Sequence, residues 1–329
     1  MNKLSVVIPA WNEREAIARV IERVLAVKDA LRLEAGVAGL EVLVVDDGSS
    51  DGTTEIVARL AAAHPRAGVR LISHRTNQGY GAALQAGLDR ATGDLLAFLD
   101  ADCTYPPERL PALCQAARMP GIALVLGDRM SSRSSQMPAL RRLGNWFFSH
   151  LVSLLARTHV SDCCSGMRVL PVATWRTLGP LPRGLDFTPA MTMRVLYRDL
   201  ALREVVIPYH ERVGRSKLKT VRDGLRFLGT ILRETWTGNR GRLLALAGQA
   251  IVLPLLALAG ATLALSTVEK SSWASVAIRA LGVLALFAGL SLARLRLAGW
   301  ARPAAPHLAL PQIANPGGRA AQGEEERAS

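Results

Sequence analysis

The sequence predicts an α/β domain built on a mostly parallel sheet, followed by two membrane-spanning helices. Three observations lead to this prediction. Short aliphatic runs alternate with helical periodicity over residues 4–127, which is typical of βαβ units. Polar motifs follow four of these runs directly. Two apolar stretches within residues 243–293 are long enough to cross a bilayer.

The length of the chain indicates its domain organisation, and its charge indicates the kind of partner that it binds. A chain of 329 residues accommodates one large domain and an appendage. Its net charge of +13 predicts a polyanionic partner, either nucleic acid or an anionic membrane. Basic residues crowd between Arg203 and Arg242, immediately before the apolar stretches, so we expect a membrane and no nucleic acid. The four cysteines lack CxxC spacing and are expected to be free thiols in a reducing compartment.

Five strands are expected in the first domain, each an aliphatic or β-branched run. They cover residues 4–8, 40–45, 69–73, 94–99 and 122–127. Helical periodicity is expected at residues 13–27 and 53–63. Strands joined by helices of this length form a parallel sheet that is buried on both faces. Ligands bind beyond the carboxyl ends of such strands, where the four polar motifs lie.

The remaining chain divides by composition. We expect the first domain to cover residues 1–217, with residues 131–149 forming a loop that leads into a helix. A basic amphipathic juxtamembrane helix is expected at 218–241. No cationic leader opens the chain, so no signal peptide is expected.

Residues 242–298 are expected to form a membrane hairpin with spans at 243–267 and 274–293. Tryptophans and arginines flank the pair, and the positive-inside rule then places both ends in the cytoplasm. The alternative is a buried helical hairpin in a soluble protein. Small residues in the spans also permit packing with a second copy, so a homo-oligomer is left open. The tail at 299–329 is expected to be disordered.

The stretch AFLDADCTYPPE at 97–108 places two carboxylates at the end of a buried strand. Asp100 and Asp102 flank one small residue, and both side chains are able to turn toward one point. Mg²⁺ and Mn²⁺ prefer oxygen ligands and often bridge carboxylates to substrate phosphates. Taken alone, the pair is more often a polar turn. Its place at a strand end, among other polar motifs, favours a metal and diphosphate site.

Two more motifs predict a nucleoside site. In DDGSSDGT, Asp47 is expected to accept hydrogen bonds from a base or ribose, while Gly48 permits a tight turn. Asp51 is expected to cap the following helix, and a structural role for Asp46 is left open beside direct contact. In PAWNE, Trp11 is expected to form a wall against the base.

Basic side chains are expected to bind phosphate groups. Arg129 in GDR follows a strand end on the same rim as the two aspartates. Further basic residues stand out against the usual solvated surface charge, namely Arg141, Arg142, Arg168, Arg212 and Lys217.

Seven segments occur in an order that carries a family resemblance: VVIPAWNE, VVDDGSSDGT, NQGYGAALQAG, LDADCTYPPE, GDRM, SDCCSGMRVL and ERVGRSKL. They cover roughly residues 4–220 and resemble the family 2 glycosyltransferases, in particular polyprenyl-phosphate glycosyltransferases of the dolichyl-phosphate mannose synthase type with a C-terminal membrane hairpin. This resemblance implies a Rossmann-like GT-A fold, a nucleotide-sugar donor, Mg²⁺ or Mn²⁺, and inversion at the anomeric carbon.

The resemblance also implies roles for individual residues. Asp100 and Asp102 would hold the metal and diphosphate, with Asp102, Arg129, Arg212 and Lys217 as the catalytic set. Some synthases have a glutamine metal ligand where this chain has Thr104, so either the Thr104 hydroxyl or a water is expected as the third ligand. The nucleoside and the rest of the substrate would contact Pro9, Trp11, Glu13, Val45, Asp47, Arg142 and Ser216.

The chemistry of the acceptor supports the same function. Transfer to a hydroxyl needs a general base, usually a carboxylate. A lipid monophosphate is already anionic at neutral pH, since its second pKa is about 6. Asp186 is the only carboxylate in LDFTPAMT, where relatives that use hydroxyl acceptors have a denser acidic motif. We therefore expect hexose transfer from a UDP- or GDP-linked sugar to polyprenyl phosphate at the cytoplasmic membrane face.

Three alternatives were weighed. One is a membrane glycosyltransferase that acts on a hydroxyl of a lipid or polysaccharide. Another is an inactive, membrane-anchored nucleotide-sugar-binding protein, against which the intact aspartate pair and basic residues argue. A nucleotide-dependent oxidoreductase is excluded, because GYG at 79–81 lacks the GxGxxG spacing and does not follow the first strand.

Overall fold

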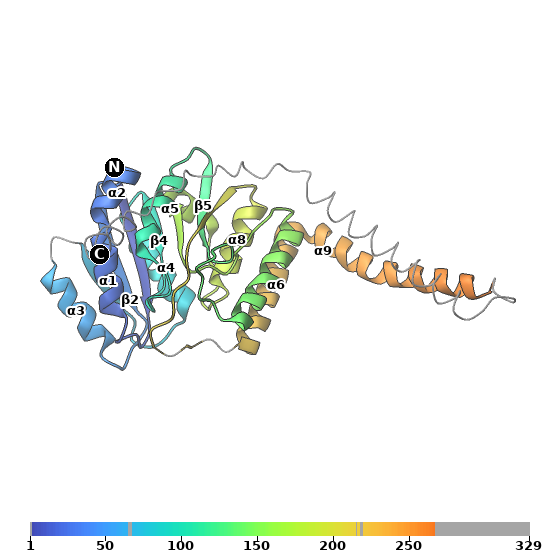
Figure 1. Cartoon of the computed structure of the whole chain (residues 1–329), viewed down its shortest axis with the longest axis horizontal. Coiled ribbons are helices and arrows are strands. Elements are labelled where there is room, and N and C mark those ends of the chain that lie inside the picture. Colours follow the sequence, from blue (N-terminus) through green and yellow to red (C-terminus); the bar gives the residue numbers. More distant parts are fainter. Residues whose placement is uncertain (1, 65–67, 215, 218–219, 267–329) are drawn as a thin grey trace, which may run out of the picture.

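A computed structural model describes residues 2–64, 68–214, 216–217 and 220–266 (Figure 1). Its described residues form a seven-stranded sheet in the order β3-β2-β1-β4-β6-β5-β7. All strands run parallel except β6, which is antiparallel to both β4 and β5. The strands are β1 (Lys3–Ala10), β2 (Gly39–Asp46), β3 (Val69–Ser73), β4 (Leu95–Phe98), β5 (Ile122–Asp128), β6 (Arg168–Pro171) and β7 (Ala201–Val206).

The sheet separates two layers of helices. Successive side chains of β1 point to opposite faces of the sheet, and both faces are buried. Val6 and Ile8 belong to the hydrophobic cluster on one face, and Val7 belongs to the cluster on the other. The first layer contains α1 (Ile17–Ala26), α2 (Lys28–Ala35) and α5 (Leu110–Ala117), with α3 (Thr53–Ala63) beside it. The second contains α4 (Tyr80–Arg90), α6 (Ala139–Ala156), α7 (Val172–Leu178) and α8 (Phe187–Tyr197). A short 3₁₀ turn, η1 (Pro107–Arg109), precedes α5.

All five predicted strands are confirmed, within a few residues at their ends. The helix expected at 13–27 is shorter, because residues 14–16 form a turn and α1 begins only at Ile17. It ends at Ala26, where Val27 separates it from a second helix, α2. The sequence prediction assigned no element to β6, β7 or α4. Strand β6 is antiparallel to its neighbours, so its direction does not fit the βαβ pattern.

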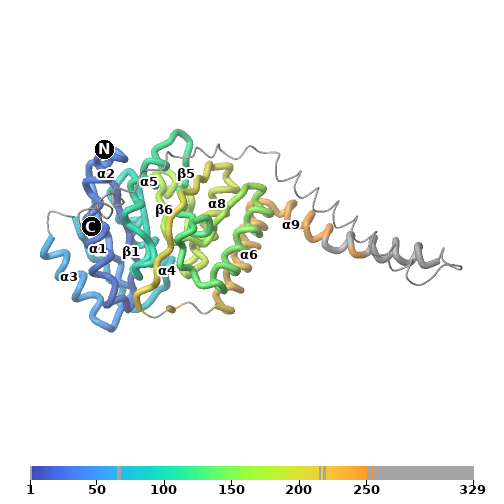
Figure 2. Tube along the Cα trace, in the orientation of Figure 1, coloured from blue at the N-terminus to red at the C-terminus, as the bar shows by residue number. Residues whose placement is uncertain are grey.

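The long helix α9 (Thr220–Ser266) begins beside α6 and α8 and then leaves the domain (Figures 1 and 2). This confirms a helix over most of the expected juxtamembrane segment. Asn239 has a non-helical backbone and kinks α9. Within the residues that the structure describes, no helix meets the length and apolarity needed to cross a membrane. The second expected span, 274–293, and the tail, 299–329, lie outside the described residues.

Buried Glu41 on β2 gives the fold a pH-dependent contribution to stability. Burial alone would raise its pKa, but hydrogen bonds from Ser5, Thr92 and Lys3 lower the pKa to about 2. A carboxylate whose pKa is depressed on folding stabilises the protein above its unfolded pKa, near 4.5. That stabilisation is lost as the pH falls from there toward about 2.

We expect Glu41→Gln to lower the free energy of unfolding at pH 7 by about 2–3 kcal/mol, because the pKa of Glu41 falls from about 4.5 in the unfolded chain to about 2 in the folded protein. Urea unfolding of the full chain in detergent, at several pH values, measures this. The difference between wild type and variant should shrink as the pH falls below about 4.5. Exposed Glu34→Gln on α2 is the control and should change little. A difference that stays constant with pH would contradict the prediction.

Candidate active site

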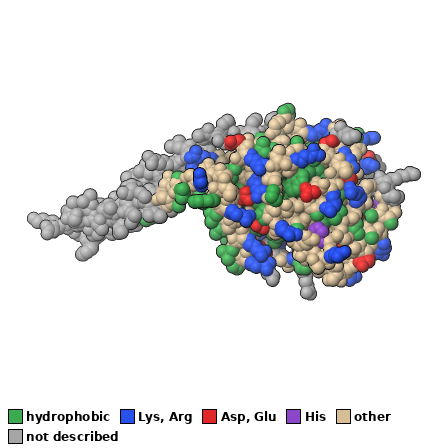
Figure 3. Space-filling view, turned by 180° about the vertical axis from the view of Figure 1, so that it is seen from behind, with side chains coloured by type: hydrophobic (Ala, Val, Ile, Leu, Met, Phe, Trp, Pro, Cys, Tyr) green, Lys and Arg blue, Asp and Glu red, His purple; other side chains and the backbone are tan. Residues whose placement is uncertain are grey.

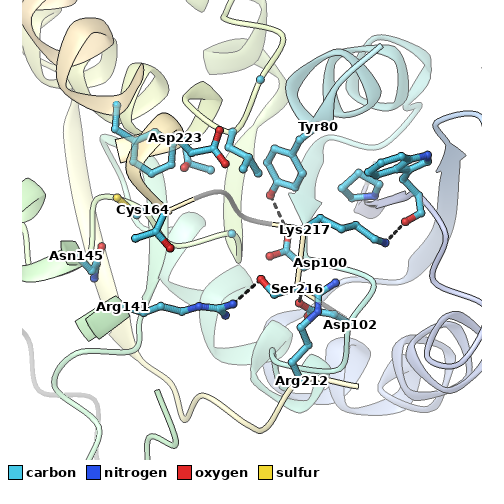
Figure 4. Close-up of a pocket in the computed structure, with 18 of the residues that line it drawn as sticks. Tyr80, Asp100, Asp102, Arg141, Asn145, Cys164, Arg212, Ser216, Lys217 and Asp223 are labelled. Carbon is cyan, nitrogen blue, oxygen red and sulfur yellow. Dashed lines mark hydrogen bonds and ion pairs between the residues drawn. The ribbon is translucent and has the colours of Figure 1, made fainter. Parts of the chain in front are cut away.

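A cavity of about 470 Å³ lies at the carboxyl ends of the parallel strands and extends to α6 and the start of α9 (Figure 4). Each strand-end motif contributes at least one lining residue. Trp11 follows β1, Asp47 follows β2, Asp100 follows β4 and Arg129 follows β5. The predicted convergence of the four motifs at one edge of the sheet is therefore confirmed.

Asp100 and Asp102 both line the cavity, and different contacts hold them. The Tyr80 hydroxyl donates to Asp100 Oδ1 at 2.8 Å. Burial and the neighbouring charge of Asp102 raise the pKa of Asp100 to about 7. Asp102 is buried, and its Oδ2 accepts a hydrogen bond from Arg212 at 2.5 Å. Gly166 packs so closely that an added Cβ would lie 2.8 Å from Asp100 Oδ2, so the Asp100 carboxylate has little freedom to move.

The two carboxylates suit a hard divalent cation. No cluster of three or more potential His, Cys, Asp or Glu ligands occurs in the described part of the chain. Mg²⁺ at phosphate-binding sites is commonly held by one or two carboxylates and completes its shell with phosphate oxygens and water. Asp100 and Asp102 fit this arrangement, in which a cation is shared with a diphosphate.

Thr104 lies behind Asp102 rather than in the cavity. It is 1% exposed and absent from the described residues that line the cavity. Its backbone N–H and hydroxyl both donate to Asp102 Oδ1, at 3.1 and 2.5 Å. These contacts orient Asp102, and they give no support to the expectation that Thr104 is a direct metal ligand.

Arg212 and Lys217 lie beside the aspartate pair, as predicted, and meet at Glu13. Glu13 Oε1 accepts from Arg212 at 2.6 Å and from Lys217 at 2.7 Å. Burial raises the pKa of Glu13 despite these two cations. Lys217 also donates to the Trp11 carbonyl, and its ammonium lies 5.5 Å from the centre of the Trp11 ring. The cations and carboxylates thus form one charged cluster at the carboxyl ends of β1 and β4.

The predicted nucleoside wall is formed in part. Pro9 and Trp11 line the cavity, and Trp11 is 39% exposed, which leaves an aromatic face open to a ligand. Val45 is buried in the hydrophobic core beneath and is not among the described lining residues. Its side chain therefore supports the wall without reaching a ligand.

Asp47 lines the cavity and is held by the turn that precedes α4. Its carboxylate accepts from the backbone N–H groups of 78–79, at 2.9 and 2.8 Å, and lies 2.7 Å from His74 Nδ1. Gly48 has a φ of +74°, and an added Cβ would lie 2.7 Å from the Thr76 backbone. The tight turn predicted at Gly48 is confirmed, and it lets the segment after β2 approach the backbone at Thr76.

Asp46 and Asp51 stabilise the DDGSSDGT turn. Asp46 Oδ1 accepts from the Ser49 backbone at 3.2 Å, which favours the structural role. Asp51 Oδ1 accepts from the backbone and hydroxyl of Thr53, the first residue of α3. The predicted contact of Asp51 with the start of that helix is confirmed, although the N-cap residue itself is Gly52.

Arg129 lines the cavity as part of a buried ion pair. Its Nε and one terminal nitrogen donate to Asp162 at 2.6 and 2.8 Å, and the other donates to the Tyr105 hydroxyl at 2.8 Å. Burial would raise the pKa of Asp162, but the Arg129 charge lowers it. A guanidinium has five N–H donors, so these three contacts leave two for a ligand.

Helix α6 presents Arg141, not Arg142, to the cavity. Arg141 donates to the Ser216 hydroxyl at 2.6 Å and to Tyr209 at 3.2 Å. Arg142 is exposed and donates to the Met130 carbonyl at 3.2 Å. Adjacent residues of a helix point in different directions, so Arg141 lines the cavity and the structure gives no support to the expected substrate contact of Arg142. Ser216 lines the cavity as expected.

Arg168 is fully buried and does not reach the cavity, in contrast to the expectation that it binds phosphate. It donates to the carbonyls of Cys163 and Ser165 and to the Thr192 hydroxyl. Burial lowers its pKa to about 10. Arg168 therefore holds the SDCCSG loop against α8.

Several lining residues escaped the sequence prediction, among them Tyr80, Tyr105, Asn145 and Cys164. Tyr80 lies in NQGYGAALQAG, a segment that contributes to the family resemblance but indicates no role for this side chain. Asp162 stood in SDCCSG, but nothing in the sequence indicated that it pairs with Arg129, 33 residues earlier. Contacts of this kind depend on the tertiary fold and leave no local pattern.

Comparison with protein families gives a match to the model described as Glycosyl transferase family 2, over residues 5–175. Two similar proteins come from Haloferax volcanii. The low-salt glycan biosynthesis hexosyltransferase Agl6 is 33% identical over 232 residues, 70% of this chain and 53% of that protein. The dolichyl-phosphate hexose transferase is 33% identical over 220 residues, 65% of this chain and 86% of that protein. The chain thus spans about half the length of the former.

Solved structures show the same architecture. Glucosyl-3-phosphoglycerate synthase from Mycobacterium tuberculosis, in complex with Mn²⁺, UDP-glucose and phosphoglyceric acid, superposes with a TM-score of 0.53. The match covers 71% of this chain and 80% of that chain at 22% sequence identity. At this identity the likeness shows the fold alone, and it confirms the mostly parallel GT-A architecture.

Proposed function

The chain belongs to glycosyl transferase family 2, and from this premise we propose that it transfers a hexose from a UDP- or GDP-linked sugar to polyprenyl phosphate, with inversion and with Mg²⁺ or Mn²⁺. One observation carries the proposal. Asp100 and Asp102 line the same cavity as Trp11, the proposed nucleoside wall, and as the cations Arg129 and Arg212. Two phosphate-bearing substrates need such an arrangement to approach one another.

The proposed transfer is a single displacement. A phosphate oxygen of the acceptor attacks the anomeric carbon of the sugar, the bond from that carbon to the diphosphate oxygen breaks, and the nucleoside diphosphate leaves. Asp100 and Asp102 would hold the divalent cation, which when bound stabilises the negative charge on the leaving diphosphate. Arg129 and Arg212 line the same cavity and would bind phosphate oxygens of the donor or the acceptor.

We propose a phosphate as the acceptor group, because its oxygen is already anionic and attacks without a general base. Asp186 does not line the cavity among the described residues, and its Oδ2 accepts from the Thr230 hydroxyl at 2.7 Å. One observation favours the alternative, a hydroxyl acceptor. Asp223, at the start of α9, lines the cavity, and a carboxylate there could serve as a base. Asp223 also forms an ion pair with Arg222 at 3.5 Å.

A lipid acceptor also accounts for the surface beside the cavity. Exposed apolar side chains project from α6 and the first turns of α9, at Leu140, Leu143, Phe147, Val221 and Leu225. Lys and Arg side chains are spread over the back of the molecule, with few acidic ones between them (Figure 3). Apolar and basic residues together favour contact with an anionic membrane. We include in the proposal the predicted hairpin at 242–298 and a cytoplasmic catalytic domain.

A radiolabel assay tests the proposed function. Membranes that contain the full chain are incubated with labelled UDP-glucose or GDP-mannose, polyprenyl phosphate and Mn²⁺. We expect a labelled glycolipid that mild acid cleaves, since the sugar would be linked through a phosphodiester. Label on a hydroxyl acceptor, with none on the lipid phosphate, would support the alternative. Binding of the nucleotide sugar without any transfer would indicate an inactive binding protein.

A further inference from the structure

Asn145 on α6 has a buried oxygen that no contact within the protein explains. The side chain is 6% exposed and lines the cavity. Its Nδ2 donates to Asp162 Oδ1 at 2.8 Å. Its Oδ1 is buried and has no hydrogen-bond partner among the described residues. A buried acceptor without a partner is destabilising. A ligand that donates a hydrogen bond to this oxygen would remove that penalty.

The orientation of the Asn145 amide is fixed by its neighbour. Asp162 is ionised, because the Arg129 charge lowers its pKa against the effect of burial, and a carboxylate only accepts hydrogen bonds. The NH₂ group must therefore face Asp162, and the carbonyl oxygen must point elsewhere. Asp162 is itself held by two hydrogen bonds from the Arg129 side chain. The free Oδ1 is thus held in a rigid network.

The place of Asn145 along the cavity indicates which part of a ligand it meets. The strand order β2-β1-β4-β6-β5 puts the nucleoside wall at β1 and β2 and the aspartate pair at β4. Helix α6 follows β5, beyond the aspartate pair. Figure 4 shows Asn145 beside Cys164, on the side of the cavity away from Asp102. A nucleotide sugar whose diphosphate lies at Asp100 and Asp102 would direct its sugar toward this wall.

The chemistry of the atom selects the group that it binds. A carbonyl oxygen only accepts hydrogen bonds, so it repels a phosphate and attracts a hydroxyl. We propose that Asn145 Oδ1 accepts a hydrogen bond from a hydroxyl of the transferred sugar and so contributes to the choice of donor. This inference rests on the proposed function. It adds a residue that distinguishes one sugar from another, which contacts with the nucleoside and the diphosphate do not do.

The test compares each nucleotide sugar with its own nucleoside diphosphate. Calorimetry on the full chain in detergent, with Mn²⁺ and without lipid acceptor, gives the affinity for UDP-glucose and UDP, and for GDP-mannose and GDP. We expect Asn145→Ala to weaken binding of the preferred nucleotide sugar about tenfold, equivalent to about 1.4 kcal/mol. Binding of the nucleoside diphosphate should change less than about twofold, because it has no sugar hydroxyl.

Asn77→Ala is the matched control, since Asn77 lines the opposite, nucleoside end of the cavity. It should change the two affinities by the same factor. Asn145→Ser provides a second variant should the alanine variant fold poorly, and circular dichroism checks both. An equal loss for nucleotide sugar and nucleoside diphosphate, or no loss for either, overturns the inference. If wild type binds the nucleoside diphosphates but no nucleotide sugar, the proposed function fails with it.

Discussion

Asp162→Ala is expected to lower the free energy of unfolding by about 3–5 kcal/mol, because it leaves the Arg129 charge buried without its counterion. Asp162 is fully buried, and it accepts from both Arg129 and Asn145. Urea unfolding of the full chain in detergent measures the effect. Transfer activity should fall as well, since Arg129 and Asn145 would lose their common anchor.

The exposed ion pair between Arg23 and Glu108 provides the control. Glu108→Ala should lower stability by no more than about 1 kcal/mol, as is usual for ion pairs in contact with solvent. Equal effects of Asp162→Ala and Glu108→Ala would contradict the role assigned to the buried pair.

Asp102→Asn is expected to reduce the rate of sugar transfer about a hundredfold or more, the usual effect of removing one electrostatic group from a reaction centre. The amide keeps the shape of the side chain but removes the negative charge that would hold the cation. It also leaves Arg212 with a neutral partner at 2.5 Å. Initial rates of glycolipid formation over a range of Mn²⁺ concentrations measure the effect.

The matched control for Asp102→Asn is Asp89→Asn. Asp89 is exposed on α4 and accepts from the Trp175 indole, outside the cavity. Its variant should retain wild-type rates. A variant Asp102→Asn that transfers sugar as fast as wild type, at limiting Mn²⁺, would show that this carboxylate does not hold the cation.

The sequence predicted the parts of the fold that follow from local pattern. Strands β1, β2, β4 and β5 are almost entirely buried, so each reads as a short continuous aliphatic run, whereas the edge strand β3 is only partly buried. The turn at Gly48 was predictable because it requires a positive φ, which glycine adopts without strain. Strand β6 was not predictable, because Arg168 in it reads as a surface charge and is in fact buried.

The candidate site likewise contains residues that local sequence pattern predicts and residues that it does not. Asp100, Asp102 and Arg129 follow strand ends, and topology alone brings them to one rim. Arg141 could not be distinguished from Arg142 without the phase of α6. The free oxygen of Asn145 depends on its contact with Asp162, 17 residues away, which no local pattern reports. Side-chain contacts between segments that are distant in the sequence could therefore not be predicted.

The most direct test of the central claim compares two acceptors that differ only in the phosphate. Purified full-length chain in lipid vesicles is given its labelled nucleotide sugar, Mn²⁺ and either polyprenyl phosphate or the polyprenol of the same chain length. Transfer to polyprenyl phosphate alone, abolished by Asp102→Asn, is the predicted result. Transfer to polyprenol at an equal or higher rate would contradict the account.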